Sequence, residues 1–196
     1  MDTLKAEKRS METKAKRLRR EGYVTGNVFG HDIEGSIPVK ITKAEADRLL
    51  KKKKKGSQIM LDLEGQQYDV LIKEIDFDAT KNQTLEIDFQ ALVSNEKVHS
   101  VAEIIFENHD KVEAGVLQEV LKEVSYRALP AALVEKVKVD VGEMEIGDTI
   151  RVKDLSIAKD KDIDILTDLE AVVATVTAVH NNVPETDEEA DAEEAK

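Results

Sequence analysis

The chain of 196 residues lacks cysteine and tryptophan and holds only three prolines and nine glycines. Without cysteine, the sequence excludes a disulfide framework, a thiolate zinc site and thiol catalysis. No apolar run reaches the roughly 18 residues that a transmembrane helix needs. The start, residues 1–5, is charged and has no apolar stretch after it, so we expect no secretory signal. These absences together favour a cytoplasmic protein.

Charge is present in excess and is unevenly distributed. The chain has 41 acidic and 29 basic residues, a net charge of −12. Residues 1–55 nevertheless hold 16 Lys and Arg against 8 Asp and Glu, whereas residues 184–196 hold seven acids and one lysine. Oppositely charged ends suggest a nucleic-acid or membrane contact near the N-terminus. The acidic end has no apolar periodicity and is predicted to be a disordered tail over 184–196.

Alternating apolar and polar residues predict a mainly β fold with few helices. Strands are predicted over 37–41, 85–92, 98–106, 137–141 and 172–179, with a hairpin formed by 59–63 and 68–72. The segment 116–129 suits a helix stripe as well as a strand face, and its β-branched residues favour strand. No βαβ rhythm occurs, so we expect two small antiparallel domains, over 1–93 and 94–183.

One helix is predicted to begin at a capping box and to run to about residue 50 or 52. Thr42 can accept a hydrogen bond from the Glu45 amide, and the Glu45 side chain can reach back to the Thr42 amide. The five lysines that follow, 51–55, fit a solvated helix end better than an RNA contact, because arginine and aromatic residues are missing among them.

A basic stretch near the N-terminus is the sharpest local feature. We expect a helical turn over 16–21 with Leu18 pointing inward and with Lys16 and Arg20 on one face. Like charges at this spacing repel each other, and bound phosphates would offset that repulsion. Arginine suits phosphate because its planar guanidinium donates two parallel hydrogen bonds. A solvated basic loop without a partner remains the alternative.

Other residue patterns predict no chemistry. The four histidines lack metal-ligand spacing, and no serine lies in a nucleophile motif, so we expect no enzyme, no cofactor and no metal. Four glycines at short spacing lack a phosphate-loop pattern and instead predict turns and close backbone approach. They are Gly22, Gly26, Gly30 and Gly35.

Several of these stretches, in order, resemble one bacterial family. The start TLKAEKRS and KAKRLRREGYVTGNVFG, the segment 81–90, GVLQEVLKEV over 115–124, the strand 137–141 and EIGDTIRVKDL over 145–155 are similar to the general stress protein Ctc family. This is the large-subunit ribosomal protein family numbered twenty-five, in its long two-domain form. The resemblance covers nearly the whole chain and includes the acidic tail.

The resemblance implies a six-stranded β-barrel-like first domain that binds 5S rRNA and a second β-rich domain. The second domain would meet neighbouring large-subunit ribosomal proteins, and neither a membrane nor a small-molecule substrate is implied. The residues that the resemblance and the basic stretch nominate for RNA binding are Arg9, Ser10, Lys14, Lys16, Arg17, Arg19, Arg20, Phe29 and Asp88.

The chain also departs from the family pattern. Thr25 stands in place of a proline, Phe29 in place of a tyrosine, and Met11 and Thr13 in place of glycines. Asp76 and Glu86 stand where the family often has glutamine and histidine, which places negative charge beside the expected RNA contact. A stress-related protein-interaction module of the same fold, with weakened RNA binding, is therefore the alternative to a ribosomal 5S rRNA-binding protein.

Overall fold

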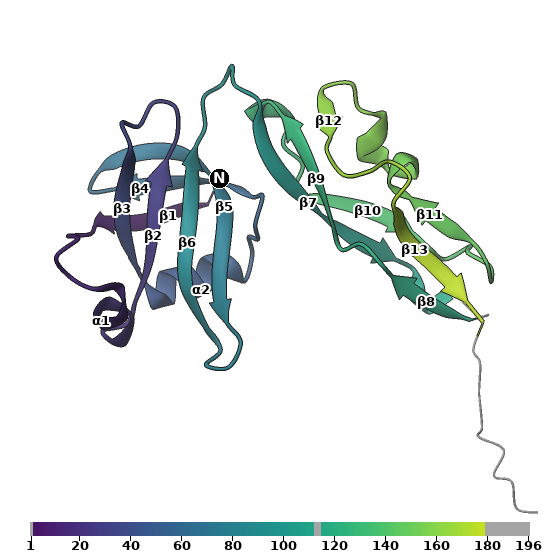
Figure 1. The fold of residues 1–196 in the computed structure, drawn as a ribbon, viewed down its shortest axis with the longest axis horizontal. Coiled ribbons are helices and arrows are strands. Elements are labelled where there is room, and N and C mark those ends of the chain that lie inside the picture. Colours follow the sequence, from purple (N-terminus) through teal and green to yellow (C-terminus); the bar gives the residue numbers. More distant parts are fainter. Residues whose placement is uncertain (1, 112–114, 179–196) are drawn as a thin grey trace, which may run out of the picture.

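The computed structural model describes residues 2–111 and 115–178 and confirms a mainly β fold with few helices (Figure 1). Strands of the first half form a closed barrel, and strands of the second half form two further sheets. The first half comprises β1 (Thr3–Lys8), α1 (Ala15–Arg20), β2 (Tyr23–Phe29), β3 (Ser36–Thr42), α2 (Lys43–Leu50), β4 (Gln58–Leu63), β5 (Gln66–Asp78) and β6 (Gln83–Ala91).

The barrel has the strand order β1-β3-β2-β6-β5-β4 and closes by pairing β1 with β4. This closing pair is parallel, as is the pair of β2 with β6, while the other neighbours are antiparallel. Alternate residues of each strand point inward, as β4 shows with Ile59, Leu61 and Leu63 all buried. The predicted hairpin is confirmed, and its second strand continues to Asp78.

Gly26 permits a close approach of β2 to β6. A Cβ atom at this position would lie 2.0 Å from the carbonyl oxygen of Ile87. Gly30 is similarly restricted, because a Cβ there would lie 2.9 Å from Ala91. Since a side chain would push the strands apart, these glycines let two strands far apart in sequence pair within the barrel.

The capping box at α2 differs in detail from its prediction. Thr42 Oγ1 accepts from the Glu45 amide at 3.4 Å, as expected. The Glu45 carboxylate, however, accepts from the Thr42 hydroxyl at 2.7 Å instead of from the Thr42 amide. Thr42 is still the last residue of β3, paired with Tyr23 of β2, so its backbone remains in the sheet register.

The second half consists of two small sheets, with strand orders β10-β7-β9-β12 and β11-β13-β8. Its strands are β7 (Val98–Glu107), β8 (Val116–Glu119), β9 (Glu123–Ala128), β10 (Lys136–Asp140), β11 (Thr149–Arg151), β12 (Ile163–Ile165) and β13 (Val172–Thr177). Short 3-10 turns connect them: η1 (His109–Lys111), η2 (Pro130–Ala132), η3 (Val152–Asp154) and η4 (Ser156–Lys159).

The segment 116–129 is strand, as expected, but it divides into two strands that belong to different sheets. Tyr126 on β9 is fully buried, and its hydroxyl donates to the Val134 carbonyl at 2.9 Å and accepts from the Val134 amide at 2.8 Å. This side chain therefore fixes the loop before β10 onto the core of the second half.

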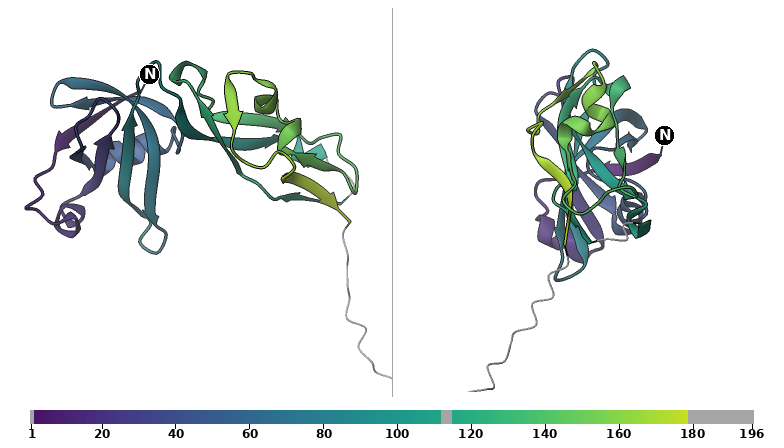
Figure 2. Two further views of the ribbon diagram at one scale, coloured as in Figure 1. Left: turned by 45° about the horizontal axis from the view of Figure 1, so that its top comes forward. Right: turned by 90° about the vertical axis from the view of Figure 1, so that its right-hand side faces the viewer.

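The two halves lie next to each other along the long axis of the molecule (Figure 2). They meet at the lysine run, and this contact corrects the expectation of a fully solvated helix end. Lys53 Nζ lies 2.7 Å from Glu135 Oε1, and Lys54 pairs with Glu103. Gly56 lies directly against β7, where a Cβ would approach the Val101 carbonyl oxygen to 2.1 Å. We keep the limits 1–93 and 94–183 as a proposal, and the predicted tail, 184–196, lies outside the described residues.

Candidate nucleic-acid interface

The helix α1 exposes basic side chains and has one buried residue, Leu18, that packs against the barrel. Leu18 is buried against the barrel, as its expected inward direction requires, while Lys16, Arg17 and Arg20 are exposed. Lys14 precedes the helix and is also exposed, and its side chain makes no capping hydrogen bond. We call these four residues the basic cluster: Lys14, Lys16, Arg17 and Arg20.

One carboxylate partly neutralises the basic cluster. Arg17 Nε lies 2.9 Å from Glu21 Oε1, four residues further along the chain. Both side chains are well exposed, so this pair contributes only about 0.2–1 kcal/mol to stability. An exposed pair of this kind can exchange its carboxylate for a phosphate. Among the described residues, no ion pair involves the other three members of the basic cluster.

Arg19 differs from its neighbours because it is bound to the barrel. Its Nε donates to the Leu85 carbonyl at 3.0 Å, and its Nη2 donates to Thr25 Oγ1 at 3.3 Å. The same Nη2 lies 3.6 Å from Glu86 Oε2. These contacts make Arg19 primarily a tie between α1 and the β2–β6 pair. Only a quarter of the Arg19 side chain is exposed, so RNA could contact only a small part of it.

The position of Arg19 follows from a signal that the sequence contained. Ala15, Leu18 and Arg19 have the i, i+3, i+4 spacing of one helix face. Because Leu18 points inward, its helical neighbour Arg19 also turns toward the barrel, whereas Lys16 and Arg20 turn away. The nomination of Arg19 for RNA binding together with Arg17 and Arg20 did not take this helical geometry into account.

Arg9 and Ser10 lie in the loop that leads from β1 to α1 and organise that loop. The Arg9 amide donates to the Pro38 carbonyl at 2.9 Å, and its Nη2 donates to the Thr13 carbonyl at 3.2 Å. Its Nε is buried and has no hydrogen-bond partner among the described residues. Ser10 is exposed, and its hydroxyl accepts from the Glu12 amide at 3.3 Å.

Phe29 and Asp88 lie on neighbouring strands of the barrel. Phe29 ends β2, is partly exposed and pairs with Gln90 of β6. Asp88 Oδ1 accepts from the Asn27 amide at 3.0 Å and from Asn27 Nδ2 at 3.3 Å. Asp88 thus holds β2 against β6, and Phe29 lies four residues beyond Thr25, about 13 Å along the strand. The structure consequently places Arg19 beside Thr25, Asp88 beside Asn27 and Phe29 at the end of β2, so that these three side chains follow one another along the β2–β6 pair.

Asn27 was not predicted from the sequence, although it connects the two acidic residues of β6. Its Nδ2 donates to Glu86 Oε1 at 3.3 Å in addition to Asp88. The sequence offered one signal for this role: Asn27 lies on the outer face of β2, opposite to the face of the buried Val24 and Val28.

A group of carboxylates covers the outer face of β5 and β6. Glu74 lies opposite Asp88, and Asp76 lies opposite Glu86, so that paired side chains share one face. We call these four residues the carboxylate patch. Only Glu86 among them has an ion-pair partner in the described residues, which is Arg19. The two family departures, Asp76 and Glu86, therefore lie directly across from each other and beside the arginine nearest to the basic cluster.

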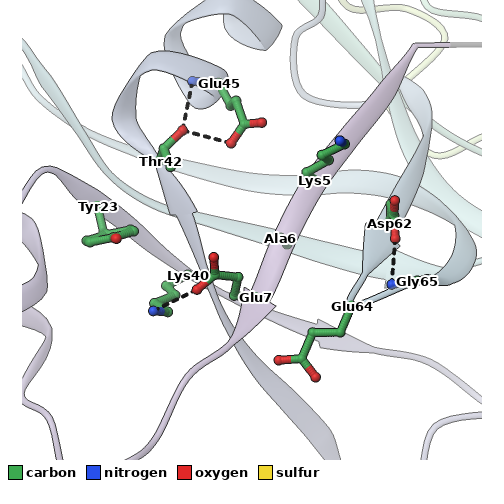
Figure 3. Close-up of a pocket in the computed structure, with 10 residues that line it drawn as sticks. All are labelled: Lys5, Ala6, Glu7, Tyr23, Lys40, Thr42, Glu45, Asp62, Glu64 and Gly65. Atoms are coloured by element: carbon green, nitrogen blue, oxygen red, sulfur yellow. Dashed lines mark hydrogen bonds and ion pairs between the residues drawn. The ribbon is translucent and has the colours of Figure 1, made fainter.

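A separate cavity of about 300 Å³ lies where β1, β3 and the β4–β5 turn meet (Figure 3). Lys40 Nζ lies 2.8 Å from Glu7 Oε2 and 4.9 Å from the centre of the Tyr23 ring. The hydrogen bond to Glu7 raises the pKa of Lys40 above its ordinary value. Glu45, Asp62 and Glu64 also line this cavity, and this excess of carboxylates does not suit a phosphate.

Residues 2–111 and 115–178 show no sign of two other kinds of site. They contain no group of three metal-ligating side chains. They also contain no helix long and apolar enough to cross a membrane.

Comparison with known proteins links both halves of the chain to one kind of protein. Residues 4–89 match the Ribosomal L25p family, and residues 97–180 match the C-terminal domain of ribosomal protein TL5. The chain is 30% identical, over 95% of its length and 94% of the relative's, to large ribosomal subunit protein bL25 of Caldanaerobacter subterraneus subsp. tengcongensis. It is 32% identical to the protein of the same name from Caldicellulosiruptor bescii, over 92% of this chain and 87% of that one.

Proposed function

The chain belongs to the bL25 family of large ribosomal subunit proteins, and on that premise we propose that its first domain binds 5S rRNA through the basic cluster. Membership of this family indicates a structural, non-enzymatic protein of the cytoplasmic ribosome. The observation that supports RNA binding is the set of four exposed cations fixed to the barrel by one buried leucine.

The basic cluster is suited to the backbone of folded RNA. Proteins recognise paired RNA largely by shape, through phosphates and 2′-hydroxyls, because its major groove is too narrow for side chains. Arg17 and Arg20 can each donate two hydrogen bonds to one phosphate, and Lys14 and Lys16 add point charges. Phe29 can pack on a sugar or a base at the far end of β2. Arg9, Ser10, Arg19 and Asp88 act mainly by holding the loop, the helix and the strands in place.

Salt dependence of binding tests this mechanism on the full chain. Four phosphate contacts predict that log affinity falls with log salt with a slope of about −3 to −4. Replacing Lys16, Arg17 and Arg20 by glutamine is expected to weaken 5S rRNA binding about 100-fold and to make the slope shallower by about 2 to 3.

A matched variant with the same loss of charge provides the control. Lys136, Lys159 and Lys161 are exposed lysines of the second half that form no ion pair among the described residues. Replacing them by glutamine should leave affinity and slope unchanged. Equal weakening by both triple variants would show that only net charge matters and would reject the assignment of the site.

The carboxylate patch favours a second candidate, a stress-related protein-interaction module with weakened RNA binding. Opposed carboxylates on adjacent strands destabilise a sheet unless a cation lies between them, so a basic protein partner would suit this face. The acidic second domain, with 18 acids against 10 bases over 94–183, suits basic neighbouring ribosomal proteins in the same way. Co-sedimentation of the chain with large ribosomal subunits separates the two candidates. About one copy of the chain per subunit would reject the second candidate. Absence of the chain from the subunits of both normal and stressed cells would reject the first.

A further inference from the structure

The junction between the two halves uses the five lysines unequally. Lys53 and Lys54 pair with Glu135 and Glu103 across the junction. Lys55, the next residue, is exposed and has no ion-pair partner among the described residues. Two lysines of the run therefore hold the second half, whereas Lys55, like Lys51 and Lys52, has a charge that no carboxylate balances among the described residues.

Lys55, and neither Lys51 nor Lys52, lines a cavity of about 340 Å³ at the junction. The barrel contributes Lys55, Gly56 and Lys73 to its lining, and the second half contributes His99 and Ser125. Cavities between domains are a preferred location of ligand sites. The ion pairs of Lys53 and Lys54 hold the barrel against the second half. We therefore expect the cavity between them to be formed before any ligand binds.

Its cations are close together and incompletely hydrogen-bonded. Lys73 Nζ donates to the His99 carbonyl at 2.8 Å, and no other acceptor for its remaining two N–H donors lies within hydrogen-bond distance among the described residues. Partial burial, and next the nearby positive charge of Lys55, lower the pKa of Lys73. Glu74 is the one carboxylate in the lining, and it forms no ion pair with either lysine.

We propose that the junction cavity binds a phosphate group between Lys55 and Lys73. A phosphate would accept the free N–H donors of Lys73 and relieve the repulsion between the two ammonium groups. The Ser125 hydroxyl, on the opposite wall, can donate to a third phosphate oxygen. The phosphate can be free inorganic phosphate or a phosphate of an RNA backbone. The site is separate from the basic cluster, so it does not depend on the function proposed for that cluster.

Titration of the full chain with inorganic phosphate at constant ionic strength tests the proposal. We expect saturable shifts of the amide NMR signals of Gly56, His99 and Ser100. Replacing Lys55 and Lys73 by glutamine should weaken this binding about tenfold or more, because charged donors are lost. The matched control replaces Lys51 and Lys52, which are exposed in the same run and do not line the cavity.

Two results would overturn the proposal: no saturable shift in the natural chain, or equal weakening in the control. If the double variant is unstable, the single variant Lys55→Gln decides instead, because Lys55 is exposed and its replacement should not disturb the fold. This variant is expected to bind phosphate about threefold more weakly. Competition distinguishes the two phosphate sources. If the phosphate comes from RNA, inorganic phosphate weakens 5S rRNA binding of the natural chain but not of the double variant. If the natural ligand of the cavity is free phosphate, adding inorganic phosphate leaves 5S rRNA binding unchanged.

Discussion

On the proposed function, the negative charge of Glu86 should weaken the attraction of the first domain for RNA, and replacing Glu86 by glutamine tests this directly. Glutamine keeps the shape of the side chain and the oxygen that accepts from Asn27. It removes the charge that lies 3.6 Å from the Arg19 guanidinium. Arg19 retains its hydrogen bonds to Leu85 and Thr25, so the cost to stability should stay below about 1 kcal/mol.

The expected gain in affinity follows from Coulomb's law. A phosphate about 8 Å from the Glu86 carboxylate is repelled by about 0.5–1 kcal/mol at a dielectric constant between 40 and 80. Salt at physiological strength, with a Debye length of about 8 Å, reduces this value to roughly 0.2–0.4 kcal/mol. The freed charge of Arg19 adds a similar attraction. Glu86→Gln should therefore tighten 5S rRNA binding by about 0.4–0.8 kcal/mol, which is a factor of about two to four.

Fluorescence anisotropy of labelled 5S rRNA, titrated with the full chain at three salt concentrations, measures this factor. Glu96→Gln is the control, because Glu96 is exposed in the connection between β6 and β7 and forms no ion pair among the described residues. Should Glu86→Gln leave affinity unchanged while the Lys16, Arg17 and Arg20 variant still loses it, Glu86 does not face the RNA, and the electrostatic reasoning is refuted.

Three further predictions concern stability, measured by urea unfolding. Gly26→Ala should destabilise the barrel by about 3 kcal/mol, because its Cβ would meet the Ile87 carbonyl, and a change below about 1 kcal/mol would contradict this. Tyr126→Phe should cost about 1–3 kcal/mol by leaving the Val134 backbone without its partner. The pKa of Asp164 is lowered by its lysine and arginine partners, so it stabilises the fold above its usual pKa of 3.8, and this contribution is lost as pH falls through the lower folded value. Asp164→Asn should thus destabilise at pH 6, and this destabilisation should shrink as the pH falls below 3.8.

The strands could be predicted because each sheet buries one face, so that apolar residues recur at every second position of the sequence. Closure of the barrel could not, since the parallel pairing of Thr3 with Met60 joins segments with no local signal in common. The capping box was half right, because Thr42 belongs to a strand as well as to a helix end, and the sheet register holds its backbone.

The candidate site divides in the same way. The exposed cations and the inward direction of Leu18 follow from local sequence, and the structure bears out both. The contacts of Arg19 with Leu85 and Glu86 depend on which strand packs beside α1, and that is a property of the whole barrel. For Lys53, the partner carboxylate lies 82 residues away, so no local pattern could distinguish this lysine from its solvated neighbours.

If the first domain binds RNA as proposed, the junction offers a reason why the net charge of −12 need not prevent it. The helix α1 lies on the side of the barrel remote from the second half in both figures of the whole fold (Figures 1 and 2). Charges separated by more than a Debye length, about 8 Å at physiological salt, scarcely affect each other. The acidic second half therefore does not oppose phosphates at α1 as long as its position is fixed. Lys53 and Lys54 provide that fixation through Glu135 and Glu103. On the proposed function, Lys53 and Lys54 would therefore assist RNA binding indirectly, by keeping negative charge away from α1, and the local charge of Glu86 would matter more than the total charge.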